Sequence, residues 1–323
     1  MSHNYRVDAL SDALQVLRLS GAVFLAAEFT APWCVLSTSG SPVTQPLPHG
    51  GRVLFFHLLT EGRCNARLVT GGDAVELSAG DLVMLPRDDN HLLGSDLRLS
   101  PVRAETIVKP AGPEGLMSIA HGGGGERTRF ICGYMVCDER LSGQLFDALP
   151  RICRVPVGET PAIDWLHNLM NAGAQETASR RPGADTVLSK LSELLLAEGL
   201  RRYVELLPDH ATGWLAGSRD RFVGRALALM HDRPRHAWTV DDLAREVGLS
   251  RSALAERFTG LVGAPPMQYL KRWRLTMAAQ RLRTDGAALA RIAADSGYDS
   301  EAAFNRAFKR ELGVTPASWR RAL

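Results

Sequence analysis

The spacing of apolar residues changes along the chain, and each change predicts a different kind of structure. Between residues 20 and 137, short apolar runs alternate with turns rich in Gly, Pro and Asp, which is typical of a β-sandwich or barrel built from many short strands. Residues 5–19 and the chain beyond residue 140 instead place apolar side chains at the three- and four-residue intervals of amphipathic helices. We therefore expect two domains, a mostly β barrel with a helical extension and then an all-α domain.

About the last hundred residues contain one pattern twice. Corresponding positions of the two copies are Gly248 and Gly297, Ser250 and Ser300, Leu254 and Phe304, and Phe258 and Phe308. The glycine suits the left-handed position that ends a helix, and the serine suits the N-cap of the next one. The apolar pair, four residues apart, buries one face of that second helix and leaves a polar face outward. Each copy therefore predicts a helix-turn-helix, whose second helix enters the major groove of DNA.

A long helix is expected between the two copies, from Pro265–Pro266 to about Arg283. At about 1.5 Å per residue, some 18 residues span roughly 27 Å. Such a helix can hold two reading helices about one turn of DNA apart, roughly 34 Å. The spacing of the copies thus predicts two reading heads on one chain.

The tandem pattern resembles the DNA-binding domain of AraC/XylS transcription regulators over residues 220–323. The resemblance lies in the Ala-x3-Gly turns, the Phe-x4-Gly-x2-Pro ends and the run from Gly297 to Ser300. It implies base contacts from the two second helices. The implied residues are Arg251, Ser252, Ala255 and Glu256 in the first copy, and Glu301, Ala302, Asn305 and Arg306 in the second. Ala255 and Glu256 depart from the family, since many relatives carry longer polar or basic residues there.

Charge is distributed unevenly and favours DNA as the partner of the C-terminal part. Residues 209–323 contain 19 Lys plus Arg against 12 Asp plus Glu, a balance of +7, whereas residues 1–208 carry −4. The basic residues cluster at 271–274, 281–283, 309–310 and 320–321. Such clusters suit phosphate contacts, and we expect Lys271 and Lys309 to make them. The alternative is that each cluster is a solvated helix face.

Two segments of the β region resemble the cupin signature. Gly80-x5-Pro86-x4-His91 matches its second half, although Asp88 stands where the pattern has a glycine. The spacing from Gly51 to His57 matches the start of the first half, but Leu59 replaces the partner histidine. The resemblance implies a cupin fold with a broken metal site, similar to the sensor domain in front of a subset of AraC relatives.

The barrel has three alternative roles: binding a small organic effector, sensing a metal, or only dimerising. A concave, mostly apolar barrel suits a small ligand, and the expected wall comprises Trp33, His57, His91 and Cys132. Histidine and thiolate also suit zinc, nickel or copper, but nothing in the spacing brings these residues together. We predict no metal, no cofactor and no catalysis. The alternatives are a cupin-type metal-dependent enzyme or metal sensor with a DNA-binding tail, and an architectural DNA-binding protein.

The expected domains are a cupin-like sensor over 1–140, a helical dimerisation extension over 141–208, a linker over 209–220 and the DNA-binding domain over 221–323. The helix near 187–207 either packs on its own barrel or pairs with a second subunit, which predicts a homodimer. Five cysteines, an odd number without Cys-x2-Cys spacing, favour a reducing cytoplasm. No apolar run reaches membrane-spanning length. We expect an unknown small effector to modulate promoter binding, and an activator role with RNA polymerase as partner stays open against repression.

Overall fold

The computed structural model describes residues 8–17, 20–38, 51–109, 117–157 and 183–321. These residues form two compact units. We call the described parts of 19–206 the β unit, and residues 207–321 together with 8–17 the helical unit. The predicted division into a mostly β part with helices and an all-α part is confirmed. None of the described helices is long and apolar enough to cross a membrane.

The β unit consists of two facing sheets. The six-stranded sheet has the order β11 (Cys153–Pro156), β6 (Asp81–Leu85), β3 (Gly51–Glu61), β10 (Arg127–Asp138), β1 (Ser20–Thr30) and β9 (Met117–Gly122). The five-stranded sheet has the order β5 (Val75–Ser78), β4 (Arg63–Leu68), β7 (His91–Gly94), β2 (Cys34–Ser37) and β8 (Val102–Arg103). Neighbouring strands are antiparallel, except that β9 runs parallel to β1 and β8 runs parallel to β2.

Alternating side chains of both sheets fill the space between them. Leu25, Ala27 and Phe29 of β1 face inward, whereas the intervening Glu28 faces outward and pairs with Arg129 of β10 at 2.8 Å. This alternation follows from the two-residue period of a strand. Inward-facing apolar side chains of both sheets therefore form the barrel core.

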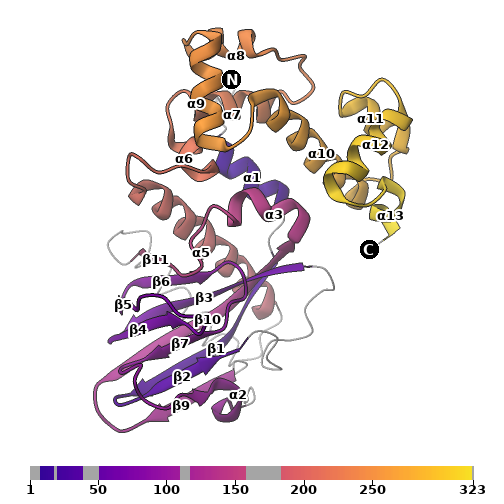
Figure 1. Ribbon diagram of the computed structural model, residues 1–323. Coiled ribbons are helices and arrows are strands. Elements are labelled where there is room, and N and C mark those ends of the chain that lie inside the picture. Colours follow the sequence, from indigo (N-terminus) through magenta and orange to yellow (C-terminus); the bar gives the residue numbers. More distant parts are fainter. Residues whose placement is uncertain (1–7, 18–19, 39–50, 110–116, 158–182, 322–323) are drawn as a thin grey trace. The chain divides into compact units, whose positions relative to one another are not determined.

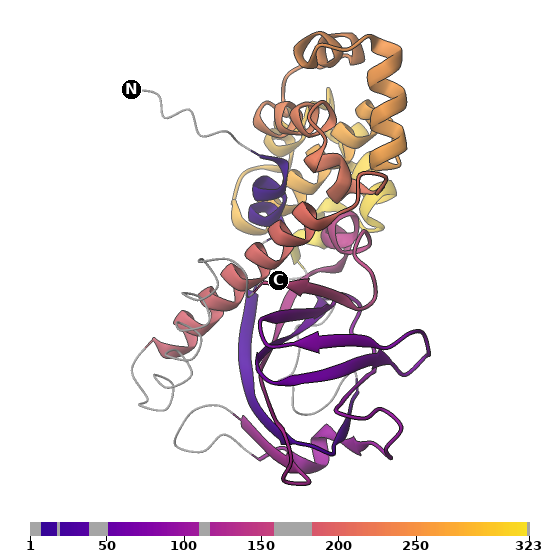
Figure 2. The same ribbon diagram turned by 90° about the vertical axis from the view of Figure 1, so that its left-hand side faces the viewer.

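The six-stranded sheet is covered on its other face by α5 (Ala184–Leu206), which runs alongside it in Figure 2. All five residues of β6 are buried, because Val83 and Leu85 face the other sheet while Leu82 meets α5. Gly199 permits the close approach, since a Cβ there would lie 2.5 Å from Cδ2 of Leu82. The short helices α2 (Ala104–Ile107) and α3 (Glu139–Phe146) complete the described unit.

The expected helical extension over 141–208 is only partly helical where it is described. Its residues 153–156 form β11, an edge strand of the six-stranded sheet. Four residues are too few to show strand alternation in the sequence, whereas α5 has the length to show a helical period. Residues 158–182, which include an expected helix near Ile163–Met170, lie outside the described residues.

The helical unit contains two helix-turn-helix motifs at the ends of one long helix (Figure 1). Its helices are α1 (Ala9–Leu17), α6 (Trp214–Arg219), α7 (Val223–Asp232), α8 (Val240–Val247), α9 (Arg251–Val262), α10 (Pro266–Thr284), α11 (Leu289–Asp295), α12 (Glu301–Leu312) and α13 (Pro316–Arg321). The expected turn chemistry is confirmed: Gly248 and Gly297 have φ values of 78° and 80°, and Ser250 and Ser300 cap α9 and α12.

The N-terminal helix α1 packs on α6, α7 and α10, and thus belongs to the helical unit although it precedes the barrel in sequence. A buried chain of polar groups lies beneath it. Trp214 donates from Nε1 to the Tyr269 hydroxyl at 2.9 Å, and that hydroxyl lies 2.7 Å from Nε2 of His231. Nδ1 of His231 faces the carboxylate of Asp12 in α1 at 3.4 Å. The expected sensor domain over 1–140 therefore includes a helix, α1, that lies in the helical unit, whereas the described extension up to Leu206 lies in the β unit.

Candidate nucleic-acid interface and barrel interior

The two expected reading helices, α9 and α12, each bury one face and expose the other. Leu254 and Phe258 are buried in α9, as are Phe304 and Phe308 in α12. The residues expected to contact DNA lie on the outer faces. Arg251, Ser252, Glu256, Glu301, Ala302, Arg306 and Lys309 are exposed, and Ala255, Asn305 and Lys271 of α10 are half-buried. These positions leave both outer faces accessible to a groove.

Arg306 and Arg251 differ in their surroundings. No hydrogen bond or ion pair links the Arg306 side chain to another described residue, so its guanidinium is available to a partner. Arg251 lies 3.5 Å from Asp241, and both side chains are largely exposed. An exposed ion pair of this kind contributes little free energy, so Asp241 competes only weakly with DNA for the Arg251 side chain.

Several arginines of the expected phosphate-binding clusters have internal partners instead. Arg272 pairs with Glu311 at 2.9 Å, and Arg274 donates to the carbonyl oxygens of Pro234 and His236. Arg320 donates to the carbonyl oxygen of Ala287. These arginines of the expected clusters thus tie α10 and α13 to neighbouring loops and helices.

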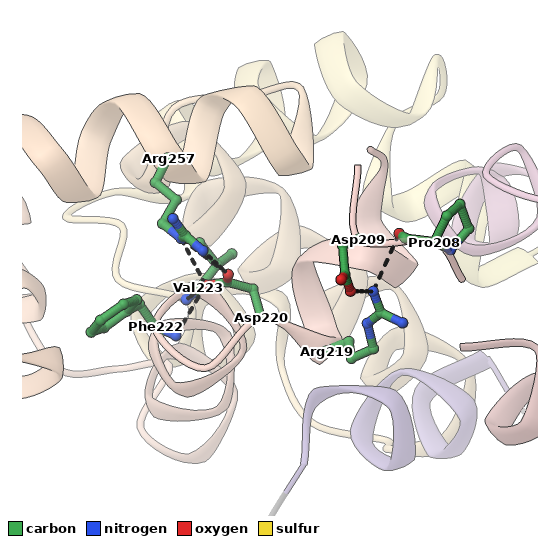
Figure 3. A network of polar contacts seen from close by, with 7 residues as sticks. All are labelled: Pro208, Asp209, Arg219, Asp220, Phe222, Val223 and Arg257. Atoms are coloured by element: carbon green, nitrogen blue, oxygen red, sulfur yellow. Dashed lines mark hydrogen bonds and ion pairs between the residues drawn. The ribbon is translucent and has the colours of Figure 1, made fainter. Parts of the chain in front are cut away.

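Asp220 joins the expected linker to the first reading helix (Figure 3). Its Oδ1 accepts from the backbone amides of Phe222 and Val223 at 3.0 and 2.9 Å, and its carboxylate also accepts from Arg257 of α9. Burial alone would raise the pKa of Asp220, but these hydrogen bonds outweigh it and hold that pKa below its usual value. Sequence spacing gave no signal for this pair.

Half of the expected linker over 209–220 is helix, since α6 occupies residues 214–219. Trp214 and Leu215 are buried, and Arg219 binds back onto the carbonyl oxygen of Pro208 and the carboxylate of Asp209, both at 3.3 Å (Figure 3). Gly217 and Ser218 therefore lie in a packed helix, because the apolar residues of α6 find partners in α7 and α9.

In the barrel, three of the four expected wall residues touch one another. Nδ1 of His57 lies 3.0 Å from Sγ of Cys132, its neighbour across β3 and β10. Nε2 of His57 lies 2.9 Å from Nε2 of His91, which comes from the opposite sheet. The other ring nitrogen of His91 lies 2.9 Å from the carbonyl oxygen of Asp89. A chain of polar contacts thus crosses the barrel core.

The carbonyl oxygen of Asp89 determines the direction of each hydrogen bond in this series of contacts. A carbonyl oxygen only accepts, so Nδ1 of His91 carries the proton and, in the neutral ring, Nε2 accepts. His57 must then donate from Nε2 and accept at Nδ1. Cys132 is left to donate its thiol proton. One neutral tautomer of each ring therefore satisfies every group, with Cys132 as a thiol.

Burial keeps these groups neutral. It lowers the pKa of His57 well below its usual value, and the neighbouring His91 adds to that effect. Burial also lowers the pKa of His91 and raises the pKa of Cys132 to about 12. A thiol with such a pKa is a poor nucleophile at neutral pH. The polar contacts from Cys132 through His57 to His91 therefore form a network in which every hydrogen-bonding group has a partner. Cys132 in this network lacks the lowered pKa of an activated cysteine.

Trp33, the fourth expected wall residue, lies apart from the histidines. It stacks on Phe29 at 4.2 Å and meets the edge of Phe130 at 6.2 Å, and Phe130 in turn contacts His57. The indole Nε1 of Trp33 is buried and has no hydrogen-bond partner among the described residues. Buried donors are normally satisfied, so a polar atom of a ligand is one partner that would fit it.

The two departures from the cupin signature have structural explanations. Asp88 has a φ of 51°, the left-handed region that a glycine adopts without strain, so the backbone keeps the turn although the glycine is absent. Leu59 is fully buried in the barrel core, where a histidine ligand would otherwise stand. Among the described residues, no group of three or more His, Cys, Asp or Glu side chains is arranged to hold a metal ion.

Comparison with known proteins gives the same two parts. The Cupin family model matches residues 8–205, and the Helix-turn-helix domain model matches residues 243–322. A putative AraC-like transcription regulator from Streptomyces lividans is 36% identical over 271 residues, which are 84% of this chain and 87% of that protein. The chain belongs to the AraC-like transcription regulators. Another putative AraC-like regulator, from Streptomyces antibioticus, is 35% identical over 270 residues, covering 84% and 88%.

A more distant relative is the RCS-specific HTH-type transcriptional activator RclR of Escherichia coli K12, 27% identical over 277 residues, covering 85% of this chain and 87% of that protein. Among solved structures, the DNA-binding domain of AdpA in complex with a target DNA covers 32% of this chain and 92% of that chain, at 29% identity and a TM-score of 0.30. ToxT from Vibrio cholerae O395 covers 94% and 98%, at 11% identity and a TM-score of 0.36. Family membership rests on the sequence matches, and the protein is a DNA-binding transcription regulator.

Proposed function

We propose that this AraC-like regulator reads one operator with both α9 and α12. The observation that carries the proposal is the pair of outward polar faces joined by α10, with Arg306 unpaired on the second. Arg251, Ser252, Ala255 and Glu256 would contact one block of bases, and Glu301, Ala302, Asn305 and Arg306 the other. Lys271 and Lys309 would bind phosphate. Arginine pairs with guanine through two hydrogen bonds in the major groove, which makes Arg306 the strongest single candidate.

A small effector in the barrel is the proposed modulator of promoter binding. The region around Trp33, Phe130 and the His57–His91–Cys132 chain is apolar with few polar groups, which is the composition of small-molecule sites. The unpartnered Nε1 of Trp33 supports a ligand with a hydrogen-bond acceptor. Modulation requires that the effector bind two states of the protein with different affinity. The barrel would then act as a sensor, without catalysis.

A homodimer formed through α5 is the proposed assembly. Val187 and Leu194 lie two helical turns apart on α5, and 44% and 42% of their surfaces are exposed. Apolar residues seven apart on one helix face are typical of helix pairing, and two-fold symmetry is the commonest closed arrangement. Binding promoter DNA places the protein in the cytoplasm, where RNA polymerase would be a further partner if the regulator is an activator.

The test is selection of bound sequences from a random DNA pool with the full chain. Two blocks of preferred bases about one helical turn apart would support reading by both helices. A single block, or no enrichment, would contradict it. The same selection with Val187 and Leu194 replaced by Glu tests the dimer, since the motif should appear singly when pairing fails.

The alternative function is a cupin-type metal-dependent enzyme or metal sensor carrying a DNA-binding part. The buried position of Leu59 speaks against an enzyme, because a catalytic metal needs three protein ligands and an open position. Elemental analysis of the purified protein, together with an oxygenase assay, distinguishes these alternatives from the regulator proposed above. Stoichiometric iron together with turnover of an oxygenase substrate would overturn the regulator-only proposal, and a stoichiometric metal without turnover would favour a metal sensor.

A further inference from the structure

Asp295, the last residue of α11, binds two arginines that come from different parts of the helical unit. Its Oδ2 lies 2.8 Å from a guanidinium nitrogen of Arg281 in α10 and 3.0 Å from one of Arg235. Arg235 belongs to the segment between α7 and α8, which leads into the first helix-turn-helix, α8 and α9. A carboxylate at a helix C-terminus is unfavourable by itself because the helix dipole is negative there. The two arginines compensate for it.

The contact from Arg235 to Asp295 joins the segment that leads into the first helix-turn-helix to α11, the first helix of the second motif. Elsewhere, each motif packs on its own part of α10. Tyr269 and Trp273 of α10 pack around His231 of α7, the helix before the first motif, and Trp319 of α13, the helix after the second motif, donates to the carbonyl oxygen of Ala279. These contacts hold each motif to α10 separately. A direct contact between the two halves of the helical unit adds a further restraint on their rotation relative to each other.

Arg274 supports the same junction from α10. It lies seven residues before Arg281, on the same side of the helix. Its Nε and Nη2 donate to the carbonyl oxygens of Pro234 and His236, at 2.6 and 2.9 Å, and so hold the segment that carries Arg235. A Cβ on Gly297 would lie 3.1 Å from Nη1 of Arg274. Arg274 of α10 therefore lies between two other parts of the helical unit. One is the segment between α7 and α8, and the other is the turn at Gly297 in the second motif.

We propose that Asp295 is a positioning residue that fixes the orientation of α12 relative to α9, and thereby the number of base pairs between the two blocks of the operator. The inference rests on the proposed function, that both helices read DNA. One added base pair moves a block by about 3.4 Å and rotates it by about 35°. Two motifs with a fixed relative orientation cannot contact both blocks after such a shift. Without the ion pairs of Asp295, the motifs can reorient and contact both blocks more readily.

The test measures affinity for three operators that differ only in spacing: the selected spacing, one base pair shorter and one base pair longer. For the unmodified protein, we expect tight binding only at the selected spacing. Asp295→Asn should reduce this preference about three- to fivefold, the range of a modest ion-pair network. It should not change which bases are preferred within either block. Arg235→Gln should act in the same way, and combining it with Asp295→Asn should add nothing.

Asp285→Asn is the matched control. Asp285 also binds Arg281, at 3.2 Å, but no contact links it to Arg235 among the described residues, so its loss should leave the spacing preference unchanged. Asp295→Glu, which keeps the charge, should restore most of the preference.

The outcomes separate the inference from the function on which it rests. If Asp295→Asn weakens all three operators equally, or changes nothing, Asp295 does not set the spacing and the inference is overturned while two-helix reading stands. If the unmodified protein binds all three spacings alike, the two helices do not read together. Both the inference and the proposed function then fail.

Discussion

Nε of Arg257 in α9 lies 3.1 and 3.0 Å from the two carboxylate oxygens of Asp220, the residue that follows α6. Asp220 also caps the first backbone amides of α7. One carboxylate thus fixes the start of α7 and the middle of a reading helix. Arg257 is therefore a structural residue, although it lies on a DNA-reading helix.

Replacing Asp220 should destabilise the helical unit. Asp220→Ala removes the cap and the ion pair and should lower the free energy of unfolding by about 1 to 2 kcal/mol. Asp220→Asn keeps an acceptor for the two amides and should cost less. Urea unfolding of the three proteins measures both effects. An Ala variant as stable as the unmodified protein would show that the cap and ion pair contribute nothing.

Cys132→Ala should destabilise the β unit by more than the loss of a small side chain explains. The substitution leaves Nδ1 of His57 buried without a donor, which costs about 1 to 3 kcal/mol. Cys132→Ser retains a donor and should cost less than Ala. Cys64→Ala is the control, because Cys64 is buried in the same core and its thiol makes no hydrogen bond among the described residues. Equal losses at positions 132 and 64 would contradict the assigned proton positions.

Stability of the β unit should fall as the pH falls below about 6.5. Burial depresses the pKa of both His57 and His91 in the folded protein, whereas in the unfolded chain each titrates near 6.5. The unfolded state therefore binds more protons at low pH, so the stability present above pH 6.5 is lost as the pH decreases. The slope approaches about 1.4 kcal/mol per pH unit for each histidine.

Urea midpoints at pH 7.5, 6.5 and 5.5 measure this effect. The control is the double variant His57→Phe with His91→Leu, which replaces both titrating rings with apolar side chains and should flatten the pH dependence. A slope unchanged in the double variant would assign the effect to other groups.

A substitution near the N-terminus should loosen the helical unit and leave the barrel unaffected. Leu17 of α1 is buried, and α1 packs on α6, α7 and α10. Leu17→Ala should cost about 2 to 5 kcal/mol. Hydrogen exchange should then increase in α7 and α10, with little change in β3 and β10. Leu14→Ala, at a half-buried position of the same helix, should have a smaller effect. Increased exchange confined to the strands would contradict the packing of α1.

Arg306 and Lys271 should differ in how they affect DNA binding. Arg306→Ala should cost about 1 to 3 kcal/mol on the selected operator and relax preference at one base position. Lys271→Ala should weaken specific and random DNA alike and reduce the salt dependence by about one phosphate contact. Affinities measured at several salt concentrations distinguish the two effects. Identical behaviour of both variants would remove the base-reading role of Arg306.

The sequence by itself determined the features that depend on near neighbours. Gly248 and Gly297 take the left-handed conformation that ends a helix, and Ser250 and Ser300 cap the helices that follow. The spacing of apolar residues predicted short strands in the first part of the chain and amphipathic helices in the last part. It therefore predicted both the barrel and the tandem helix-turn-helix. The repeat also showed that one chain carries two such motifs, because repetition needs no knowledge of tertiary contacts.

Only the tertiary structure decided which buried or charged groups meet. Apolar spacing shows that a face is covered but does not show what covers it, so α1 could not be assigned to the helical unit. His57 and His91 lie on opposite sheets, and their contact depends on how the sheets pack. Which acidic side chain lies near an arginine of a basic cluster depends on how the helices pack, and the fold places Arg281 2.8 Å from Asp295.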